Sequence, residues 1–388
     1  MSEPLPSIVV NLSAVIIALT DEQPRVLMVG VPDAAVDDTD AGRVLEALPT
    51  GPLDAAGDRT LDLALRRWVR ASAGLELGYV EQLYTFGDRY RDPRESAGGV
   101  RVVTAAYLAL VRESQPPGDL TTSWRSVYRC LPWEDWREGR PRVIDETIAP
   151  ALNHWIESAS GLVQRRQRKV RAGVAFGFEE SPWDGERVLN RYEILYELGL
   201  VKEAVRDGRT PAVDESLPSE VAGLEMAADH RRILATAVGR IRAKIRYRPV
   251  VFELMGETFT LLQLQRAVEA LAGVRLHKQN FRRLVEQGGL VERTGQRDHL
   301  TGGRPAEVFR FRREVLLERP APGGGLPRAP PGTKPPPPPP PPPPNKNGAG
   351  GRRFCEGGGV TPPDGRFDKH PGPERTSGGP GGRGRDGG

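Results

Sequence analysis

The chain has 388 residues, enough for two domains and a tail, and its formal net charge of +4 is modest for this length. Its two cysteines, Cys130 and Cys355, lie far apart, which excludes a disulfide framework and a zinc site built from clustered cysteines. The start lacks the basic segment of a signal peptide, and no apolar run reaches the ~18 residues of a membrane helix. We therefore expect a cytoplasmic protein without a membrane partner.

The first 160 residues alternate between strand-like and helix-like patterns. Apolar runs rich in β-branched or aromatic residues predict strands at residues 8–19, 25–31, 79–87 and 100–111. Apolar positions at helical spacing predict a helix that begins at Leu61 and ends at Gly74, a residue suited to helix termination. Strands, a helix and further strands together predict a mixed α/β domain over residues 1–160.

The segment from residue 49 to residue 93 contains a glycine loop, a helix with Arg67 and a closing glycine, Gly74. This order resembles the Nudix box, the signature of hydrolases that cleave nucleoside diphosphates linked to another moiety. Aligned on the closing glycine, the three metal-binding glutamates of the family's helix correspond to Trp68, Ala71 and Ser72. Magnesium requires hard oxygen ligands, which two of these side chains lack and a serine supplies poorly. The expectation is an inactive Nudix-like domain with no metal and no cofactor.

Residues 81–88 (EQLYTFGD) and 102–110 (VVTAAYLAL) extend the resemblance. They are similar to the Nudix-related transcriptional regulators of NAD metabolism, which join a Nudix-like sensor to a DNA-binding winged helix. The resemblance implies a pocket for ADP-ribose, NAD or a related nucleotide metabolite. Arginines and aromatic rings suit a pyrophosphate and a stacked base, although packing in the core and a solvated charge run are alternatives. The candidate ligand residues are Arg67, Tyr84, Asp88, Arg89, Arg91 and Tyr107.

Residues 161–228 are expected to form a helical linker. The basic run at residues 164–171 lies within a helical pattern and is more simply explained as a solvated helix face than as a DNA contact. Residues 188–205 carry an apolar stripe at a spacing of 3.6 residues. This stripe makes the segment a candidate for homodimer contacts.

Residues 229–318 are expected to form a winged helix-turn-helix. Asp229 is the predicted N-cap of a basic helix, and Thr260 and Gln263 are a predicted capping box at the start of the next. A short turn and a second, polar helix at residues 276–287 follow. Two short predicted strands then enclose a loop with the composition of a wing.

The charge of this region favours a nucleic-acid partner. Residues 229–313 contain 18 Lys or Arg and 8 Asp or Glu, a local charge of +10, which leaves −6 for the rest of the chain. Such a concentration of positive charge is typical of a phosphate-binding surface. The expected partner is a double-stranded DNA operator. The candidate contact residues are Thr260, Gln263, His277, Lys278, Gln279, Asn280, Arg282, Arg283, Gly303 and Arg304.

Residues 319–388 are expected to be a disordered, low-complexity tail. Ten consecutive prolines at residues 335–344 favour polyproline II, and the segments beyond them have almost nothing to bury. A slip of reading frame in GC-rich DNA would explain this composition without any function.

The sequence as a whole predicts an α+β multidomain protein, with a Nudix-like αβα sandwich before the winged helix. The expected function is that of a dimeric transcriptional regulator of NAD metabolism that senses a nucleotide. One alternative is an active Nudix hydrolase of ADP-ribose-like substrates whose atypical metal ligands include Glu76 or Glu81. A non-enzymatic scaffold is another.

Overall fold

A computed structural model of the protein describes residues 8–32, 43–89, 91, 95, 98–112, 122–178, 181–209, 223–247, 249–298 and 305–314. All of these residues belong to one compact unit, Met1–Lys334. The predicted tail at residues 319–388 lies outside the described residues, as do Gly303 and Arg304 of the predicted wing.

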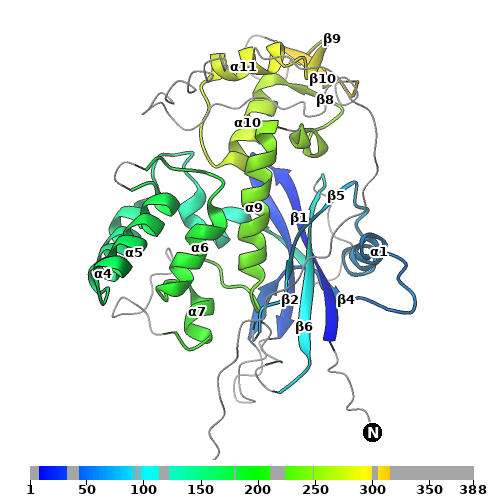
Figure 1. Ribbon diagram of the computed structural model, residues 1–388. Helices are drawn as coiled ribbons and strands as arrows, with labels where there is room; N and C mark the ends of the chain where they lie inside the picture. The colour runs from blue at the N-terminus through cyan, green and yellow to red at the C-terminus, as the bar shows by residue number, and fades with distance from the viewer. Residues whose placement is uncertain are drawn as a thin grey trace, which may run out of the picture. The chain divides into compact units, whose positions relative to one another are not determined.

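A mixed sheet of seven strands occupies the N-terminal part of the described chain (Figure 1). β1 (Ile8–Thr20) and β2 (Gln23–Pro32) form the predicted hairpin. β1 also pairs in parallel with β6 (Arg101–Leu110), and β5 (Tyr79–Phe86) pairs antiparallel with β6 on the opposite side. Strands covered on both faces read as continuous apolar runs, which is the pattern of β1 and β6. The remaining strands are β3 (Val44–Ala47), β4 (Thr50–Pro52) and β7 (Thr122–Ser126).

α1 (Leu61–Ala73) covers one face of this sheet. The hydroxyl of its N-cap residue, Thr60, accepts a hydrogen bond from the Leu63 amide at 3.2 Å. Gly74, with a φ of 62°, ends the helix as predicted. The buried side of α1 packs with side chains of β1 and β6 in a hydrophobic cluster whose larger members include Leu65, Val69 and Tyr107.

α9 (His230–Tyr247) packs against the other face of the sheet (Figure 1). Its buried residues belong to a second hydrophobic cluster, which extends from Val15 and Leu108 of the sheet to Phe281 of the C-terminal region. The core therefore continues across the predicted boundary at residues 228 and 229, because α9 packs on both the sheet and the elements that follow it.

A group of short helices lies between the sheet and α9 in the chain. These are α3 (Val127–Cys130), η2 (Pro132–Glu134), η3 (Ile144–Ile148), α4 (Ala149–Glu157), α5 (Leu162–Phe176), α6 (Val188–Glu197) and α7 (Lys202–Arg206). The helix predicted over residues 188–205 is thus two helices, separated at Gly199, where φ is 69°. Tyr192 and Leu195 of the apolar stripe are fully buried, and α6 packs on α9. Two other members of this stripe, Leu189 and Tyr196, are half-buried, so the stripe faces mainly its own chain.

The C-terminal part of the described chain is a winged helix, as predicted. Its sheet has the strand order β8-β10-β9, and the residues of the predicted capping box, Thr260 and Gln263, bond to each other as expected. Its elements are η4 (Val250–Leu254), β8 (Thr258–Thr260), α10 (Leu261–Ala272), α11 (Lys278–Gln287), β9 (Val291–Asp298) and β10 (Ala306–Phe311). None of the described helices is both long enough and apolar enough to cross a membrane.

Candidate functional site

The indole ring of Trp68 lies where the first helical carboxylate of a Nudix box is expected. The ring rests on Gly51 of β4 so closely that a Cβ there would come within 1.8 Å of Trp68 Cε2. Trp68 Nε1 donates a hydrogen bond to the carbonyl oxygen of Pro52 at 3.1 Å. Because an indole nitrogen is a donor only, this side chain offers a cation no lone pair.

The neighbouring positions supply no carboxylate either. Ala71 is exposed, and the Ser72 hydroxyl donates to the main-chain oxygen of Trp68 at 2.8 Å. Within the described ranges, no group of three or more His, Cys, Asp or Glu side chains lies in an arrangement that could hold a metal ion. The residues present around α1 therefore do not fit a divalent metal.

The two glutamates considered as substitute ligands are both paired with cations. Glu76 forms an ion pair with Arg70 at the surface. Glu81 lies 2.5 Å from Lys244 Nζ and 3.0 Å from Arg240 Nη1, both on α9. Burial alone would raise the pKa of Glu81, but its bonds with Lys244 and Tyr79 more than offset this and lower it. Glu81 thus connects β5 to α9, Glu76 lies in an exposed surface pair, and the two carboxylates do not form a common metal site.

Arg67 is held by a carboxylate of the loop before α1. Its Nε and Nη2 donate to the two oxygens of Asp58 at 2.9 and 2.7 Å. This bidentate bond lowers the pKa of the Asp58 carboxyl, whose side chain is only 6% exposed. The arginine thereby fixes the loop over the start of the helix.

The other predicted ligand residues are distributed over both faces of the sheet. Tyr107 lies in the cluster beneath α1, where burial raises the pKa of its phenol. Tyr84 is 61% exposed and makes an edge-to-face contact with Phe86, which belongs to the cluster beneath α9. Asp88 and Arg89 are exposed at the end of β5. The structure brings Tyr84, Asp88 and Arg89 to one sheet edge but places Tyr107 beneath the box helix.

Arg91 is buried in an ion pair with Asp229, the residue just before α9. Its Nε and Nη2 donate to the two carboxylate oxygens at 2.9 and 2.5 Å, and its Nη1 donates to the Thr104 hydroxyl at 2.7 Å. Both charged side chains are 7% exposed. Asp229 does begin α9, since its main-chain oxygen accepts from the amides of Arg232 and Ile233. Its carboxylate links the helix to the segment after β5.

α11 presents a polar face that no described residue covers. Phe281 and Val285 are buried against the winged-helix core, Leu284 is half-buried, and the other side chains of its first two turns are exposed. The exposed candidates for DNA contact are His277, Lys278, Gln279, Asn280, Arg282 and Arg283. No ion pair or side-chain hydrogen bond joins Lys278, Arg282 or Arg283 to another residue of the described chain. Unpaired cations beside amide side chains on an exposed helix are suited to phosphates and base edges.

The other two predicted DNA-contact residues lie at the start of α10. Thr260 is 4% exposed, and its hydroxyl accepts from the Gln263 amide at 3.2 Å. Gln263 is exposed and its Oε1 accepts from the Thr260 amide at 2.7 Å. This pair stabilises the helix that supports α11.

Sequence analysis missed Glu269, a carboxylate on the buried side of α10. It is 2% exposed and accepts a hydrogen bond from the amide of Leu276, which lies in the turn before α11. The sequence feature that could have indicated this buried carboxylate is its position directly beside the apolar stripe of Leu264, Val268 and Leu271. A buried carboxylate requires partners, and here the turn of the helix-turn-helix supplies one.

Comparison with known proteins agrees with this architecture. Residues 251–311 match the model of the NrtR DNA-binding winged helix domain. The chain is similar to the ADPR responsive transcriptional repressor NtrR of Acinetobacter baylyi, with 40% identity over 88 residues. That match covers 23% of this chain and 35% of the relative, so the chain spans about a third of the length of the curated relative it matches.

Two solved structures are similar over most of the chain at low identity. The Shewanella oneidensis NrtR complexed with a 27mer DNA has 20% identity and a TM-score of 0.47, covering 79% of this chain and 95% of its own. A MutT/nudix family protein from Enterococcus faecalis has 16% identity and a TM-score of 0.44, covering 80% and 90%. The chain therefore joins a Nudix-like mixed-sheet domain to a C-terminal winged helix, and residues 251–311 of that winged helix are similar to the NrtR DNA-binding domain.

Proposed function

We propose that the protein is a DNA-binding transcriptional regulator of NAD metabolism, in which the Nudix-like domain senses ADP-ribose or a related nucleotide without hydrolysing it. The observation that carries this proposal is the exposed, unpaired polar face of α11 within a winged helix that matches a DNA-binding domain family. The name of the Acinetobacter baylyi relative, an ADPR responsive repressor, suggests the class of nucleotide.

In the proposed complex, α11 lies in the major groove of the operator. Arg282, Arg283 and Lys278 would bind guanine edges or phosphates, while Gln279 and Asn280 offer amide groups that can pair with adenine. Arg304, in the wing predicted from the sequence, would contact the minor groove or a phosphate. The nucleotide can regulate this complex only if it binds the DNA-competent and DNA-free conformations with unequal affinity.

The Nudix-like domain should bind ADP-ribose without turning it over. With Mg²⁺ or Mn²⁺ present, we expect no hydrolysis, because Trp68, Ala71 and Ser72 supply no carboxylate. Without metal, ADP-ribose at about 100 times its Kd should stabilise the fold by about 2.7 kcal/mol and raise Tm by about 5 °C. Product release and thermal unfolding are measured on the same preparation. Turnover of about 1 s⁻¹ or faster would restore the hydrolase alternative, and no change in Tm would remove ADP-ribose as the ligand.

The protein is further proposed to act as a homodimer, because winged and helix-turn-helix proteins commonly read two half-sites with two copies. The apolar stripe of α6 packs largely on α9, whereas α5 carries exposed apolar residues at positions i, i+7 and i+11, which place them on one face. These are Val163, Val170 and Val174, with exposed fractions of 74%, 57% and 39%. A second copy packed along this face would bury a stripe that water otherwise surrounds.

Val170→Glu should therefore disrupt self-association. We expect a monomer by sedimentation velocity at micromolar concentration, and an operator affinity lower by about 100-fold because the avidity of two linked half-site contacts is lost. Val205→Glu, at a 43% exposed position on α7, is the matched control and should change neither quantity. A Val170→Glu variant that remains dimeric would exclude this face as the interface.

A further inference from the structure

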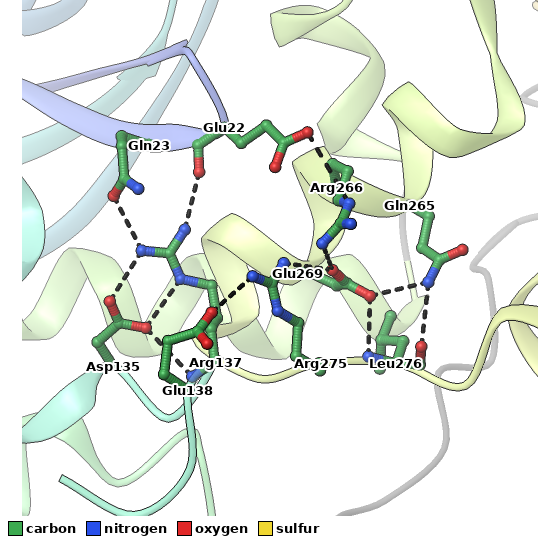
Figure 2. A network of polar contacts seen from close by, with 10 residues as sticks. All are labelled: Glu22, Gln23, Asp135, Arg137, Glu138, Gln265, Arg266, Glu269, Arg275 and Leu276. Carbon is green, nitrogen blue, oxygen red and sulfur yellow. Dashed lines mark hydrogen bonds and ion pairs between the residues drawn. The ribbon is translucent and has the colours of Figure 1, made fainter. Parts of the chain in front are cut away.

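An arginine of the segment after η2 joins the first hairpin of the Nudix-like sheet to that segment. Arg137 Nη1 donates to the main-chain oxygen of Glu22 at 2.8 Å, and Nη2 donates to Gln23 Oε1 at 2.9 Å (Figure 2). The same guanidinium makes two bonds of 2.8 Å with Asp135. The Arg137 side chain is only 8% exposed, and its bonds to Gln23 and Asp135 are partly buried, whereas its bond to Glu22 lies at the surface. The β1–β2 turn and the segment at residues 135–138 are thereby fixed to each other.

The segment at residues 135–138 is bonded in turn to the turn of the helix-turn-helix. The amide of Trp136 donates to the main-chain oxygen of Gly273 at 2.7 Å. Arg275 Nη2 donates to Glu138 at 2.7 Å. Gly273 has a φ of 72°, and a Cβ there would lie 2.5 Å from the main-chain oxygen of Glu134. The two segments are therefore in direct backbone contact.

Glu269 connects this turn to the start of α11. Its carboxylate accepts from the Leu276 amide at 3.0 Å, from Gln265 Nε2 at 2.8 Å and from Arg275 Nη1 at 3.1 Å (Figure 2). Burial alone would raise its pKa, but these hydrogen bonds more than offset that effect and lower it. Leu276 directly precedes His277, the N-cap residue of α11. The carboxylate thus determines where the DNA-facing helix begins.

A second link runs through Arg266 but is weaker. Arg266 Nη1 lies 3.3 Å from Glu269, and its Nε lies 3.8 Å from the Glu22 carboxylate. Glu22 is 56% exposed, and exposed ion pairs contribute little free energy. Of these two polar links between the hairpin and the winged helix, the one through Arg137 is therefore the more sheltered, and it lies beside the direct packing of α10 on β2.

The other end of β1 reaches the box region. Residues Asn11–Ser13 of β1 pair with β4, the strand that carries Gly51 beneath Trp68. Thr50 donates a hydrogen bond to the Ser13 hydroxyl at 3.0 Å. β1 is thus one continuous strand with the box at one end and the turn that binds Arg137 at the other.

We infer that Arg137 and Glu269 are positioning residues that couple the Nudix-like sheet to α11, so that a displacement of β1 by bound nucleotide changes the placement of the recognition helix. This inference rests on the proposed function. Arg137 connects the sheet to the turn, and Glu269 connects the turn to the helix. Neither residue touches DNA or nucleotide in this scheme.

The test measures coupling separately from binding. A duplex is first selected from a random library with the full-length protein, and its Kd is measured with and without saturating ADP-ribose. The ratio of the two Kd values is the coupling, for which typical allosteric proteins give about 5- to 150-fold. Arg137→Met retains the length of the side chain but removes the fork of donors. In the Arg137→Met variant, the ratio of the two Kd values for DNA should fall to between about one and two. The Kd for ADP-ribose in the absence of DNA should change by less than about threefold.

Arg171→Met is the matched control. Like Arg137, which pairs with Asp135 and lies over the Tyr128 ring, Arg171 pairs with Glu197 at 2.6 Å and lies over the Trp155 ring, but it is on α5. This variant should retain the wild-type ratio. If Arg137→Met does not fold, Gln23→Leu removes one acceptor of the same guanidinium and should lower the ratio in the same direction.

The outcomes distinguish the inference from the function on which it rests. A wild-type ratio of one would show that ADP-ribose does not regulate DNA binding, which contradicts the proposed function itself. A wild-type ratio well above one that persists in the folded Arg137→Met or Gln23→Leu variant would overturn the coupling role alone. An equal loss in Arg171→Met would assign the effect to general destabilisation and would also overturn it.

Discussion

Replacing Glu134 by alanine should lower the free energy of unfolding by about 3–5 kcal/mol, because it leaves two buried guanidinium groups without their counter-ion. Arg191 donates to the two carboxylate oxygens at 2.5 and 3.0 Å, and Arg242 Nη1 donates to the second oxygen at 2.5 Å. The exposed fractions of the Glu134, Arg191 and Arg242 side chains are 0%, 0% and 4%. Two guanidinium groups would then be buried without a compensating charge, and this cost lowers the free energy of unfolding.

Urea denaturation with Glu197→Ala as the control measures this effect. Glu197 also pairs with an arginine, but its side chain is 36% exposed, so its loss should cost no more than about 1 kcal/mol. Burial would raise the pKa of Glu134, but the two guanidinium groups more than offset this and lower it. Its contribution is thus present above the ordinary glutamate pKa of about 4.3 and is lost as the pH falls through the lowered value. If Glu134→Ala and Glu197→Ala lowered the free energy of unfolding equally, the buried Glu134–Arg191–Arg242 cluster would stabilise the fold no more than an exposed ion pair does.

Removing three cations from α11 should reduce operator affinity by at least about 100-fold. Each contact to a base or phosphate contributes about 1–3 kcal/mol, and 1.4 kcal/mol is a factor of ten. The variant is Lys278→Ala, Arg282→Ala and Arg283→Ala combined. These side chains are exposed and make no ion pair within the described chain, so folding should be unaffected. Fluorescence anisotropy with operator and random duplex measures the change.

A control with the same loss of charge is available on α5. Arg165→Ala, Arg166→Ala and Lys169→Ala remove three exposed cations from the basic run at residues 164–171. If that run is only a solvated face, the operator affinity should change by less than about threefold. An equal loss in both triple variants, with the α5 variant still dimeric by sedimentation velocity, would place DNA on α5 and remove the assignment of α11.

The single variants separate two kinds of contact. Loss of a base contact relaxes the preference at one operator position, whereas loss of a phosphate contact weakens all sequences alike and lowers the slope of log Kd against log salt by about one. Arg282→Ala and Arg283→Ala measured at two salt concentrations therefore assign each arginine to bases or to the backbone.

Local patterns predicted much of this fold because each depends on neighbours in the chain. The capping box of Thr260 and Gln263, the termination of α1 at Gly74 and the strands β1 and β6 are all set by a few consecutive residues. The exposed face of α11 follows from the same helical spacing, since burial of Phe281 and Val285 leaves the polar residues outside. The resemblance to the Nudix box also identified the positions, Trp68, Ala71 and Ser72, at which this chain lacks the family's metal-binding glutamates.

Contacts between segments that lie far apart in the sequence could not be predicted from such local patterns. Arg91 was predicted as a ligand residue, but it is paired with Asp229, 138 positions later, and no local feature links the two. Strand periodicity likewise indicates that Tyr107 is buried, but not that α1 rather than α9 covers it. The stripe of α6 was recognised as apolar, whereas its partner proved to be α9 of the same chain. Which surface meets which is decided by packing of the whole chain.

The contact between Trp68 and Gly51 has an evolutionary consequence. While the indole lies on the glycine, no larger residue can be accommodated at position 51, since even a Cβ would overlap the ring. A change of Trp68 to glutamate would remove that packing and introduce one acidic residue where several are needed to hold magnesium. A single change at position 68 therefore costs packing energy without creating a metal site, and the two positions constrain each other as an epistatic pair. Among descendants of this protein, changes at residues 51 and 68 are expected to occur together.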